Sequence, residues 1–495
     1  MFADNGSPKA PSDPRDLLAQ AIENNLGLQV ERLEVGVQTD TVEAERGRFD
    51  PELGFEIGID QVYRPRNAED LIGSSLSFQQ APDYDGERAH FTTSLSGRTA
   101  LGTRYELTGG SSRNESIYTA DDSSIFDPEY SSNVRLSVTQ PLLKNFGLDV
   151  NLAPVNIAKA EREAAIYETQ GVIQAVMARV LRACYEVYFA TENIAVKEQS
   201  IALAQTLLEA NQKRVDQGRM SPIAVTQAEA RIAEARAELV DAQTFQQERQ
   251  ARLRELTATS YDFNGPAYVF DSLGELLPLP NELEAAASYA GDMLASNADY
   301  QAVLQRAETE GIRVVFNKNQ LYPEVNLRLS LGTSGLESDF GSSYSDFSER
   351  EGPDWGAAVE VRMPLGNRTA KAQYRASKKR EKQALLRVKE TEVQLLRALD
   401  TAVNNLKAAM QRQELIGESV QLAEAALSAE ESRLANGVTT NIEVLNQQRE
   451  LSVSQTEALA AEVEVHSAWL QLQLLKGRLS EQLGFALQFD LDPQS

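Results

Sequence analysis

An apolar period of seven residues restricts the fold of this chain more than any other feature. Between residues 173 and 215, within a helical pattern that starts at about residue 154, an apolar side chain recurs at every seventh position. The positions are Ile173, Val180, Val187, Ile194, Ile201, Leu208 and Val215. Heptads of this kind are typical of helices in a left-handed supercoil. A helix over residues 154–215 would be roughly 90 Å long at about 1.5 Å per residue, so we expect an elongated coiled coil rather than a compact globule.

The heptad pattern occurs a second time in the C-terminal half, and each copy resumes after a short interruption. The second copy has Leu399, Leu406, Gln413, Val420, Leu427 and Leu434. The resumed runs are Val225, Ile232, Leu239 and Leu253 in the first copy, and Val444, Leu451, Ala458, Val465, Leu472 and Leu479 in the second. Alanines beside these positions, such as Ala228, Ala235, Ala242, Ala423 and Ala426, favour close helix packing. The sequence therefore predicts two long helical hairpins.

The interruptions have the residues of tight turns between antiparallel helices. Gly218 and Gly437, 219 residues apart, fall where the end of a helix needs a left-handed residue. Glycine adopts that conformation at no steric cost because it has no Cβ. After the first turn we expect Ser221 to cap the next helix and Pro222 to take its first position. Each hairpin is thus predicted to end in a glycine-capped tip.

The duplication also covers the segments before the hairpins. Helical patterns run over about residues 16–48 and 283–319 and close at Pro51 and Pro323, 272 residues apart. After each proline the period changes to two, which predicts strands with one apolar and one polar face. Leu53, Phe55, Ile57 and Ile59 start the first copy, and Val325, Leu327, Leu329 and Leu331 start the second. A second pair of alternating runs ends at Pro141 and Pro364.

Two interpretations of these strands are open from alternation alone: a soluble sandwich that buries the apolar face, and a membrane β-barrel. The small number of strands, with no second set of apolar faces, favours the barrel. Two further strand-like pieces, 89–97 and 103–109, either join the sheet or form an external hairpin. Aromatic residues that suit a membrane interface gather near the loop ends. They are Tyr118, Phe126, Tyr130, Phe340, Tyr344, Phe347 and Trp355.

Composition narrows the class of partner. With 73 acidic and 48 basic residues the formal net charge is -25, which disfavours nucleic acid and anionic membrane surfaces and favours cationic partners or cargo. No apolar run reaches the 18 residues of a membrane-spanning helix, and the first residues do not have the pattern of a signal peptide. The single cysteine, Cys184, excludes an intrachain disulfide and is expected to be a small buried side chain.

The sequence offers no catalytic or metal site. The two histidines, His90 and His466, lie far apart without ligand-spaced neighbours. The acidic residues are spread over helix faces, where charge normally means solvation. We therefore expect no enzyme, no cofactor and no metal.

Taken together, these features resemble the TolC family of outer-membrane efflux proteins. The resemblance rests on the duplication, the Pro51 and Pro323 junctions, the Gln140-Pro141 and Met363-Pro364 junctions, and the two Arg-x-x-x-Gly turns. It implies an α+β membrane protein that forms a homotrimer. Each protomer would give strands to one shared antiparallel transmembrane β-barrel, and its coiled-coil helices would form a periplasmic α-helical barrel with a belt around its middle.

The resemblance divides the chain into two repeats between short tails. The tails are 1–14 and 488–495. Repeat 1 covers 15–258, with strands over about 52–142 and its tip at Gly218; repeat 2 covers 285–487, with strands over about 324–364 and its tip at Gly437. An irregular equatorial linker, 259–284, joins them and contains two Leu-Pro pairs.

The resemblance also assigns functional residues. The expected adaptor-docking tips are Arg214, Gly218, Arg219, Met220, Arg433, Gly437, Val438 and Thr439. Glu443 matches an acidic position that narrows the tunnel mouth in relatives, whereas the next matching position is Asn446, so the acidic ring is weaker here. No cysteine near the N-terminus matches the lipid anchor of some members.

The function implied is a passive exit duct across the outer membrane and periplasm of a Gram-negative cell. A periplasmic adaptor and an inner-membrane pump, in a tripartite efflux or type I secretion system, would dock on it and open it. Outer-membrane lipid is the other expected partner. The alternative is a soluble coiled-coil scaffold or tethering protein, for which the heptads alone suffice.

Overall fold

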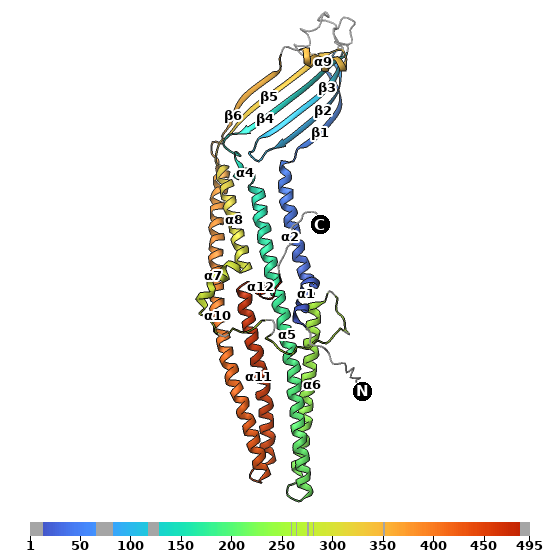
Figure 1. The fold of residues 1–495 in the computed structure, drawn as a ribbon. Helices are drawn as coiled ribbons and strands as arrows, with labels where there is room; N and C mark the ends of the chain where they lie inside the picture. The colour runs from blue at the N-terminus through green and yellow to red at the C-terminus, as the bar shows by residue number, and fades with distance from the viewer. Residues whose placement is uncertain are drawn as a thin grey trace, which may run out of the picture. The chain divides into compact units, whose positions relative to one another are not determined.

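Figure 1 shows the computed structural model, which describes residues 13–65, 83–116, 128–258, 260–263, 265–274, 277–280, 282–349 and 352–485. The chain divides into two compact units. The hairpin unit comprises the residues up to 37, 163–305 and those from 386 onward, and the sheet unit comprises 38–162 and 306–385. The predicted tail at 488–495, Tyr118 and Phe126 lie outside the described residues. So does the predicted tail at 1–14, except Asp13 and Pro14, with which the first helix begins.

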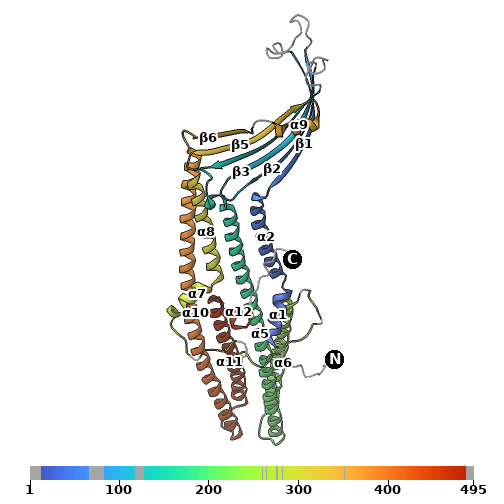
Figure 2. The ribbon, with the colours of Figure 1, turned by 45° about the horizontal axis from the view of Figure 1, so that its top comes forward.

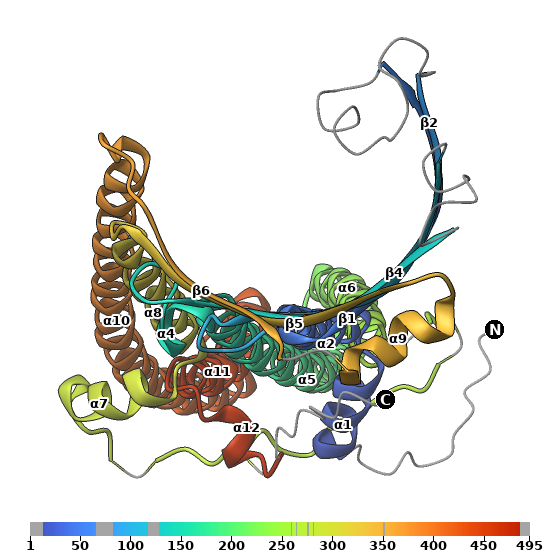
Figure 3. The same ribbon diagram turned by 90° about the horizontal axis from the view of Figure 1, so that it is seen from above.

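The sheet unit contains one antiparallel sheet in which each strand pairs with the next along the chain. The strands are β1 (Glu52–Arg64), β2 (Tyr84–Arg98), β3 (Arg104–Ser116), β4 (Glu129–Pro141), β5 (Glu324–Glu337) and β6 (Asp354–Arg362). Figures 2 and 3 show them as a single curved layer. The pieces predicted at 89–97 and 103–109 lie in β2 and β3, which pair with β1 and β4. They therefore belong to the sheet and do not form an external hairpin.

The register places the apolar side chains of all six strands on one side, which we call the apolar face. One row of paired residues crosses the whole sheet: Leu53, Leu95, Leu107, Leu136, Leu331 and Trp355. The predicted alternation is confirmed by this register. Because successive side chains of a strand point to opposite sides, Glu56, Arg135 and Glu360 fall on the other side, the polar face.

Helix α9 (Phe340–Glu349) packs over one end of the apolar face. The rings of Phe91 and Phe340 are 6.0 Å apart, and the hydroxyls of Ser132 and Ser343 are 2.6 Å apart. Phe340 and Tyr344, expected at a loop end, lie on this helix with their rings 5.1 Å apart. The residues that the structure describes contain no second sheet to cover the rest of the face.

Two pairs of helices precede the strands of the two halves. They are α1 (Pro14–Asn24) with α2 (Leu26–Arg46), and α7 (Ala286–Ser296) with α8 (Ala298–Asn319). The prediction of one helix in each place is wrong, because Asn25 and Asn297 interrupt them with extended backbone, at ψ 116° and 119°. The Asn25 side-chain oxygen accepts from the Leu28 N–H at 3.1 Å, and that of Asn297 from the Tyr300 N–H at 3.0 Å. Each asparagine caps a new helix instead of continuing the old one.

The hairpins are formed by four long helices. They are α5 (Ala153–Asp216) with α6 (Ile223–Thr257), and α10 (Arg368–Ala435) with α11 (Asn441–Leu475). The short elements are η1 (Gly47–Phe49), α4 (Leu148–Asn151) and α12 (Leu479–Gln482). In the predicted linker the described residues form no helix or strand, yet Tyr268 and Phe270 are buried in the core of the hairpin unit. Gln250 satisfies the backbone there: its Nε2 donates to the Tyr268 carbonyl at 2.6 Å and its Oε1 accepts from the Tyr268 N–H at 2.8 Å.

Burial follows the predicted heptads in most of the hairpin unit. The buried positions include Ile173, Val180, Val187, Leu399, Leu406, Leu427, Leu434, Val444, Leu451, Val465, Leu472 and Leu479. Toward the first tip the prediction is wrong, because Ile201 and Leu208 are only partly buried and Ser200, Ala204 and Leu207 are buried instead. There α5 packs between α6 and α11, so a different side of the helix is covered.

Candidate functional site

The two tips end their helices with the same hydrogen-bonded motif. Gly218 and Gly437 have φ of 68° and 70°, which confirms the predicted left-handed conformation. In the first tip the N–H of Gly218 donates to Val215 and that of Arg219 to Arg214, both at 2.8 Å. In the second the N–H of Gly437 donates to Leu434 at 3.2 Å, and the following N–H to Arg433 at 2.9 Å. This is the Schellman arrangement, which satisfies the last carbonyls of each helix.

The helices restart in a way that differs from the prediction for Ser221 and Pro222. Helix α6 begins one residue later than expected, at Ile223, with Pro222 in the capping position and no side-chain cap. The carbonyl of Ser221 accepts the N–H of Ala224 at 3.1 Å. The backbone of Ser221, rather than its hydroxyl, therefore supports the first turn.

The tip residues divide into exposed and packed groups. Gly218, Arg219, Arg433, Gly437 and Val438 are exposed, and Arg214, Met220 and Thr439 are partly buried. Met220 packs on an apolar cluster that includes Leu207, Leu427 and Val444. Glu430 accepts hydrogen bonds from Thr439 and, at 2.9 Å, from Arg433, which fixes the second tip. The exposed group is thus held on an ordered base.

A buried pair of asparagines, which the sequence pattern does not predict, lies behind the tips. Asn211 is 0% and Asn441 5% exposed, and Asn211 Nδ2 donates to Asn441 Oδ1 at 2.7 Å. Asn441 Nδ2 also donates to the Ala224 carbonyl at 3.3 Å, so the pair links α5, α6 and α11. A polar residue at one buried position of a coiled coil specifies register, because sliding would leave it unpaired. Two asparagines at the ends of apolar runs are the sequence signal for such a pair.

A network of charged side chains, which the sequence pattern does not predict either, joins the two hairpins. Arg231 of α6 is 4% exposed and contacts Glu238 at 2.9 Å and Glu234 at 3.3 Å. Lys197 of α5 contacts Glu238 at 3.1 Å, and Arg449 of α11 contacts Glu234 at 2.6 Å. Burial alone would raise the pKa of the Glu238 carboxyl, but its hydrogen bonds to Arg231 and Lys197 and their positive charges outweigh burial and lower that pKa.

The two expected gate residues lie on the first turns of α11. Glu443 and Asn446 are both exposed, whereas Val444 and Leu445 between them are buried. The spacing of three residues puts the two on one side of the helix. Glu443 forms no ion pair with any described residue, so its carboxylate is free to face water.

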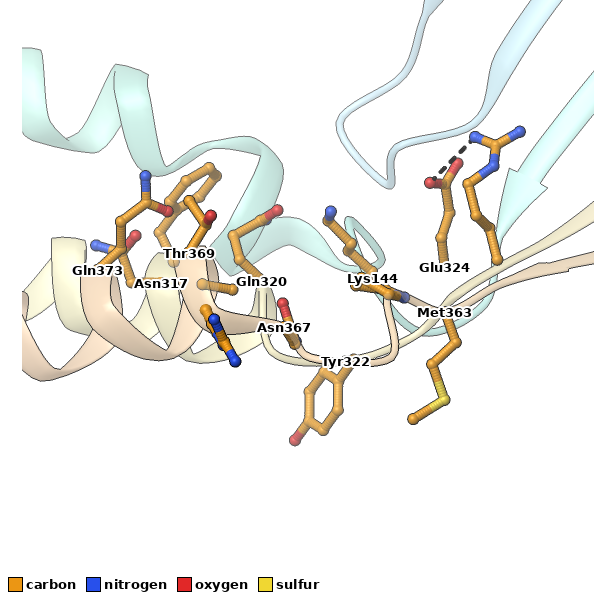
Figure 4. Close-up of a pocket in the computed structure, with 14 residues that line it drawn as sticks. Lys144, Asn317, Gln320, Tyr322, Glu324, Met363, Asn367, Thr369 and Gln373 are labelled. Atoms are coloured by element: carbon orange, nitrogen blue, oxygen red, sulfur yellow. Dashed lines mark ion pairs between the residues drawn. The ribbon is translucent and has the colours of Figure 1, made fainter.

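The four prolines stand at the ends of strands. Pro51 and Pro323 directly precede β1 and β5, Pro141 is the last residue of β4, and Pro364 follows β6 by two residues. These are positions where a strand loses no ladder hydrogen bond to proline. Beside Pro364 a cavity of about 780 Å³ opens between the end of α8 and the start of α10 (Figure 4). The Arg362 and Glu324 side chains at its wall approach to 3.6 Å.

Most of the apolar face is exposed in the chain. Ile57 is 85%, Phe55 73% and Trp355 77% exposed, and Val359 and Val361 exceed 60%. Patches of this extent on a protein surface mark a protein or membrane contact. The chain therefore presents an apolar surface that requires a covering.

The cysteine and the two histidines do not come together in one site. Cys184 is buried in the core, as expected, and burial raises the pKa of its thiol. His466 is buried beside Tyr185, and burial lowers its pKa, while His90 lies in β2 with Nδ1 3.5 Å from Asp60. Among the described residues no group of three or more potential ligands could hold a metal ion. No described helix has both the length and the apolar character needed to cross a membrane.

These features define a class of protein: one with a one-sided apolar sheet and paired coiled-coil hairpins. A family model described as "Outer membrane efflux protein" matches residues 97–259 and 290–478. The chain belongs to this family of TolC-like outer-membrane factors. Membership places it in the outer membrane of Gram-negative bacteria, in a family of efflux channels rather than a class of enzymes.

Individual relatives agree with the family assignment. The chain is 26% identical over 361 residues to the outer membrane efflux protein BepC of Brucella suis biovar 1 (strain 1330), covering 72% of this chain and 75% of that protein. Among solved structures it resembles the outer-membrane channel OprN (15% identity, TM-score 0.64, covering 94% of this chain and 90% of that one). It also resembles VceC from Vibrio cholerae (18% identity, TM-score 0.61, covering 94% and 99%). These structural likenesses show the fold.

Proposed function

We propose that the chain is the outer-membrane exit duct of a tripartite efflux or type I secretion system. The observation that carries the proposal is the uninterrupted, exposed apolar row from Leu53 to Trp355. Among the described residues the outer strands of this sheet, β1 and β6, pair with no further strand, so their edges are open. A membrane tolerates a sheet only when its edges are closed and its outer face is apolar. Three copies that join β6 of one to β1 of the next would meet both conditions.

In this proposal the hairpins of the three protomers form the periplasmic tunnel. The charged network and the asparagine pair hold the two hairpins of a protomer together. The exposed residues Gly218, Arg219, Gly437 and Val438 would dock the adaptor that recruits the inner-membrane pump. Glu443, with Asn446 beside it, would line the mouth that opens on docking. The duct is passive, and the pump supplies the energy.

Reconstitution into planar lipid bilayers tests the proposal. Purified protein is expected to run as a trimer in detergent and to produce stepwise, reproducible conductance. The competing proposal, a soluble coiled-coil scaffold, predicts a protein that stays in solution without detergent. Solubility of that kind together with a silent bilayer would exclude the duct.

Replacement of the tip glycines tests docking. A Cβ added at Gly218 or Gly437 meets no atom within 4 Å, so valine is opposed only by the positive φ. That costs about 1–2 kcal/mol, and more for a β-branched residue. We expect Gly218→Val with Gly437→Val to reduce copurification of the adaptor about tenfold, because the tips lose their shape, while the trimer persists.

The matched control is Gly417→Val, within α10. An added Cβ there also meets no atom within 4 Å, and the backbone is helical. This variant should bind the adaptor like the parent. If the tip variant loses its trimer as well as the adaptor, the tips are structural elements and not docking sites.

A further inference from the structure

The start of α10 is strongly basic, whereas the chain as a whole is acidic. Residues 368–389 contain nine basic residues and one acidic residue, Glu381, in a protein of net charge -25. Six of the basic side chains are exposed and lie within about 100° of the helix circumference at 3.6 residues per turn. We call them the basic face: Arg368, Lys371, Arg375, Lys378, Lys379 and Lys382.

The basic face is explained neither by ion pairs within the chain nor by a stabilising effect of its charges on α10. None of its six side chains forms an ion pair with any residue that the structure describes; Lys371 donates to the Gly366 carbonyl at 3.3 Å, and Lys378 lies over the Tyr374 ring at 5.3 Å. The first turn of α10 contains no acidic residue. Cations at a helix N-terminus face the positive end of the helix dipole, which is unfavourable. The basic face therefore calls for an external anion.

The basic face lies on the side of α10 that is turned away from α8. The opposite side of α10 packs on α8: Ser377 is buried, and Glu381 lies near Gly311 of α8. At the first turn of α10, Arg368 lines the cavity beside Pro364 together with Thr369 and Gln373. Lys371 and Lys382 lie about 160–180° around the helix from Gln373, so the basic face beyond Arg368 points away from that cavity.

The loop between β6 and α10 carries exposed apolar side chains directly before the basic face. Met363 continues the alternation of Val359 and Val361 on the apolar face, and Leu365 is 100% exposed. In Figure 4 the side chains of Met363 and Tyr322 extend to one side of the loops, and those of Lys144 and Glu324 to the other. Exposed apolar and aromatic side chains followed directly by basic ones are typical of a membrane interface.

We propose that the basic face binds the phosphates of anionic phospholipid headgroups in the leaflet at the foot of the barrel. The inference rests on the proposed function, which places the apolar face in the membrane. Arg368 to Arg375 span roughly 10 Å of helix, about the depth of a headgroup layer. Lys378 and Lys382 follow about 5 Å and about 10 Å beyond Arg375, on the scale of the Debye length of roughly 8 Å. The patch thus tethers the duct where the barrel meets the tunnel.

A neighbouring copy of the chain is a weaker candidate for the anion. The last two carboxylates of α2 before the sheet are already engaged: Glu43 pairs with Arg46, and Glu45 pairs with Arg48 at 3.1 Å. Those acids have no need of a partner on another protomer. A lipid surface supplies phosphates at any spacing, which suits six long, mobile side chains.

The test is amine labelling of the intact trimer in nanodiscs. We expect a water-soluble acylating reagent to modify Lys371 and Lys378 at least fivefold more slowly in phosphatidylglycerol discs than in phosphatidylcholine discs. Lys407, exposed elsewhere on α10, should react equally in both and serves as the internal control. Equal rates at Lys371 and Lys378 in the two lipids would overturn the proposal.

Two further arms separate the other sources of an anion. Equal protection by inorganic phosphate in phosphatidylcholine discs would assign the site to free phosphate, and slow labelling already in detergent would assign the cover to a neighbouring protomer. Both results overturn the lipid assignment. Failure of the chain to enter discs at all is a different outcome, because it removes the duct itself.

Lipid retention gives a second measurement. The variant Lys371→Gln, Arg375→Gln, Lys378→Gln, Lys382→Gln should copurify with at least fivefold less phosphatidylglycerol than the parent. The matched control removes as many exposed charges away from the face: Arg236→Gln, Arg252→Gln, Arg380→Gln, Arg387→Gln. If the two variants retain equal lipid, the basic face is not the binding site.

Discussion

Lysine at position 357 is expected to destabilise the protein in a membrane by about 2–4 kcal/mol, whereas lysine at position 358 has little effect. The two are adjacent exposed alanines of β6 on opposite faces: Ala357 pairs with Leu329 on the apolar face, and Ala358 with Arg328 on the polar face. Both variants add the same charge to the same residue type in the same strand. Only the surroundings of the new ammonium group differ.

The size of the effect follows from the position of Ala357. It lies five residues from the end of β6, so roughly 16 Å along the strand at about 3.3 Å per residue. In a tilted strand that is near the middle of an apolar band about 25 Å tall, where an ammonium group loses its hydration. Lysine can recover little of that loss because the interface is distant.

The measurement is the free energy of unfolding of Ala357→Lys and Ala358→Lys in phospholipid vesicles, from urea titrations followed by gel mobility of the folded form. If the sheet instead belonged to a soluble sandwich, the protein would be folded in buffer without vesicles, and the urea titration would give the same free energy of unfolding there. Equal free energies for the two variants would show that the apolar face does not contact lipid.

The features that sequence alone predicts are those set by a few neighbouring residues. The left-handed turns at Gly218 and Gly437 follow from what a helix end requires of its backbone. The two faces of β1 follow from alternation, because the side-chain period of a strand is fixed. Such features do not depend on what the rest of the chain packs against.

Features set by distant partners were harder to predict. That β2 joins the sheet depends on its pairing with β1 across residues 65–83, which separate the two strands. That Ser200 is buried rather than Ile201 depends on which helices surround α5. The helix break at Asn25 was missed for a different reason. Its side-chain oxygen accepts a backbone N–H that would otherwise belong to a continuing helix. The spacing of apolar residues carries no information about such a hydrogen bond.

In the candidate site, too, local features could be predicted from the sequence and features that depend on distant residues could not. The exposed tip residues and Glu443 could be named because they match a motif, whereas Arg231 could not. Its significance depends on α5 and α11 both lying against α6, which brings Lys197 and Arg449 to carboxylates they do not neighbour in sequence. Charges spaced along helices normally indicate a solvated face.

Replacement of Arg231 by alanine should cost about 2 kcal/mol of stability. Removing one partner of a buried ion pair typically costs about 3–5 kcal/mol, because the other charge stays buried. Here Glu238 keeps Lys197 and Glu234 keeps Arg449, and both carboxylates retain contact with water, so a smaller loss is expected. The control is Arg236→Ala, an exposed arginine of the same helix, which should change stability by less than about 0.5 kcal/mol.

The difference between the parent and Arg231→Ala should also depend on pH. The pKa of Glu238 in the folded protein lies below its ordinary value of 4.5. Its contribution is therefore fully present above about pH 4.5 and is lost as the pH falls through the lower, folded value. Urea midpoints followed by helical circular dichroism in detergent should differ most at neutral pH and converge in acid. A difference that stays constant from pH 7 to pH 3 would show that Arg231 stabilises the hairpins by packing alone and not through its carboxylate partners.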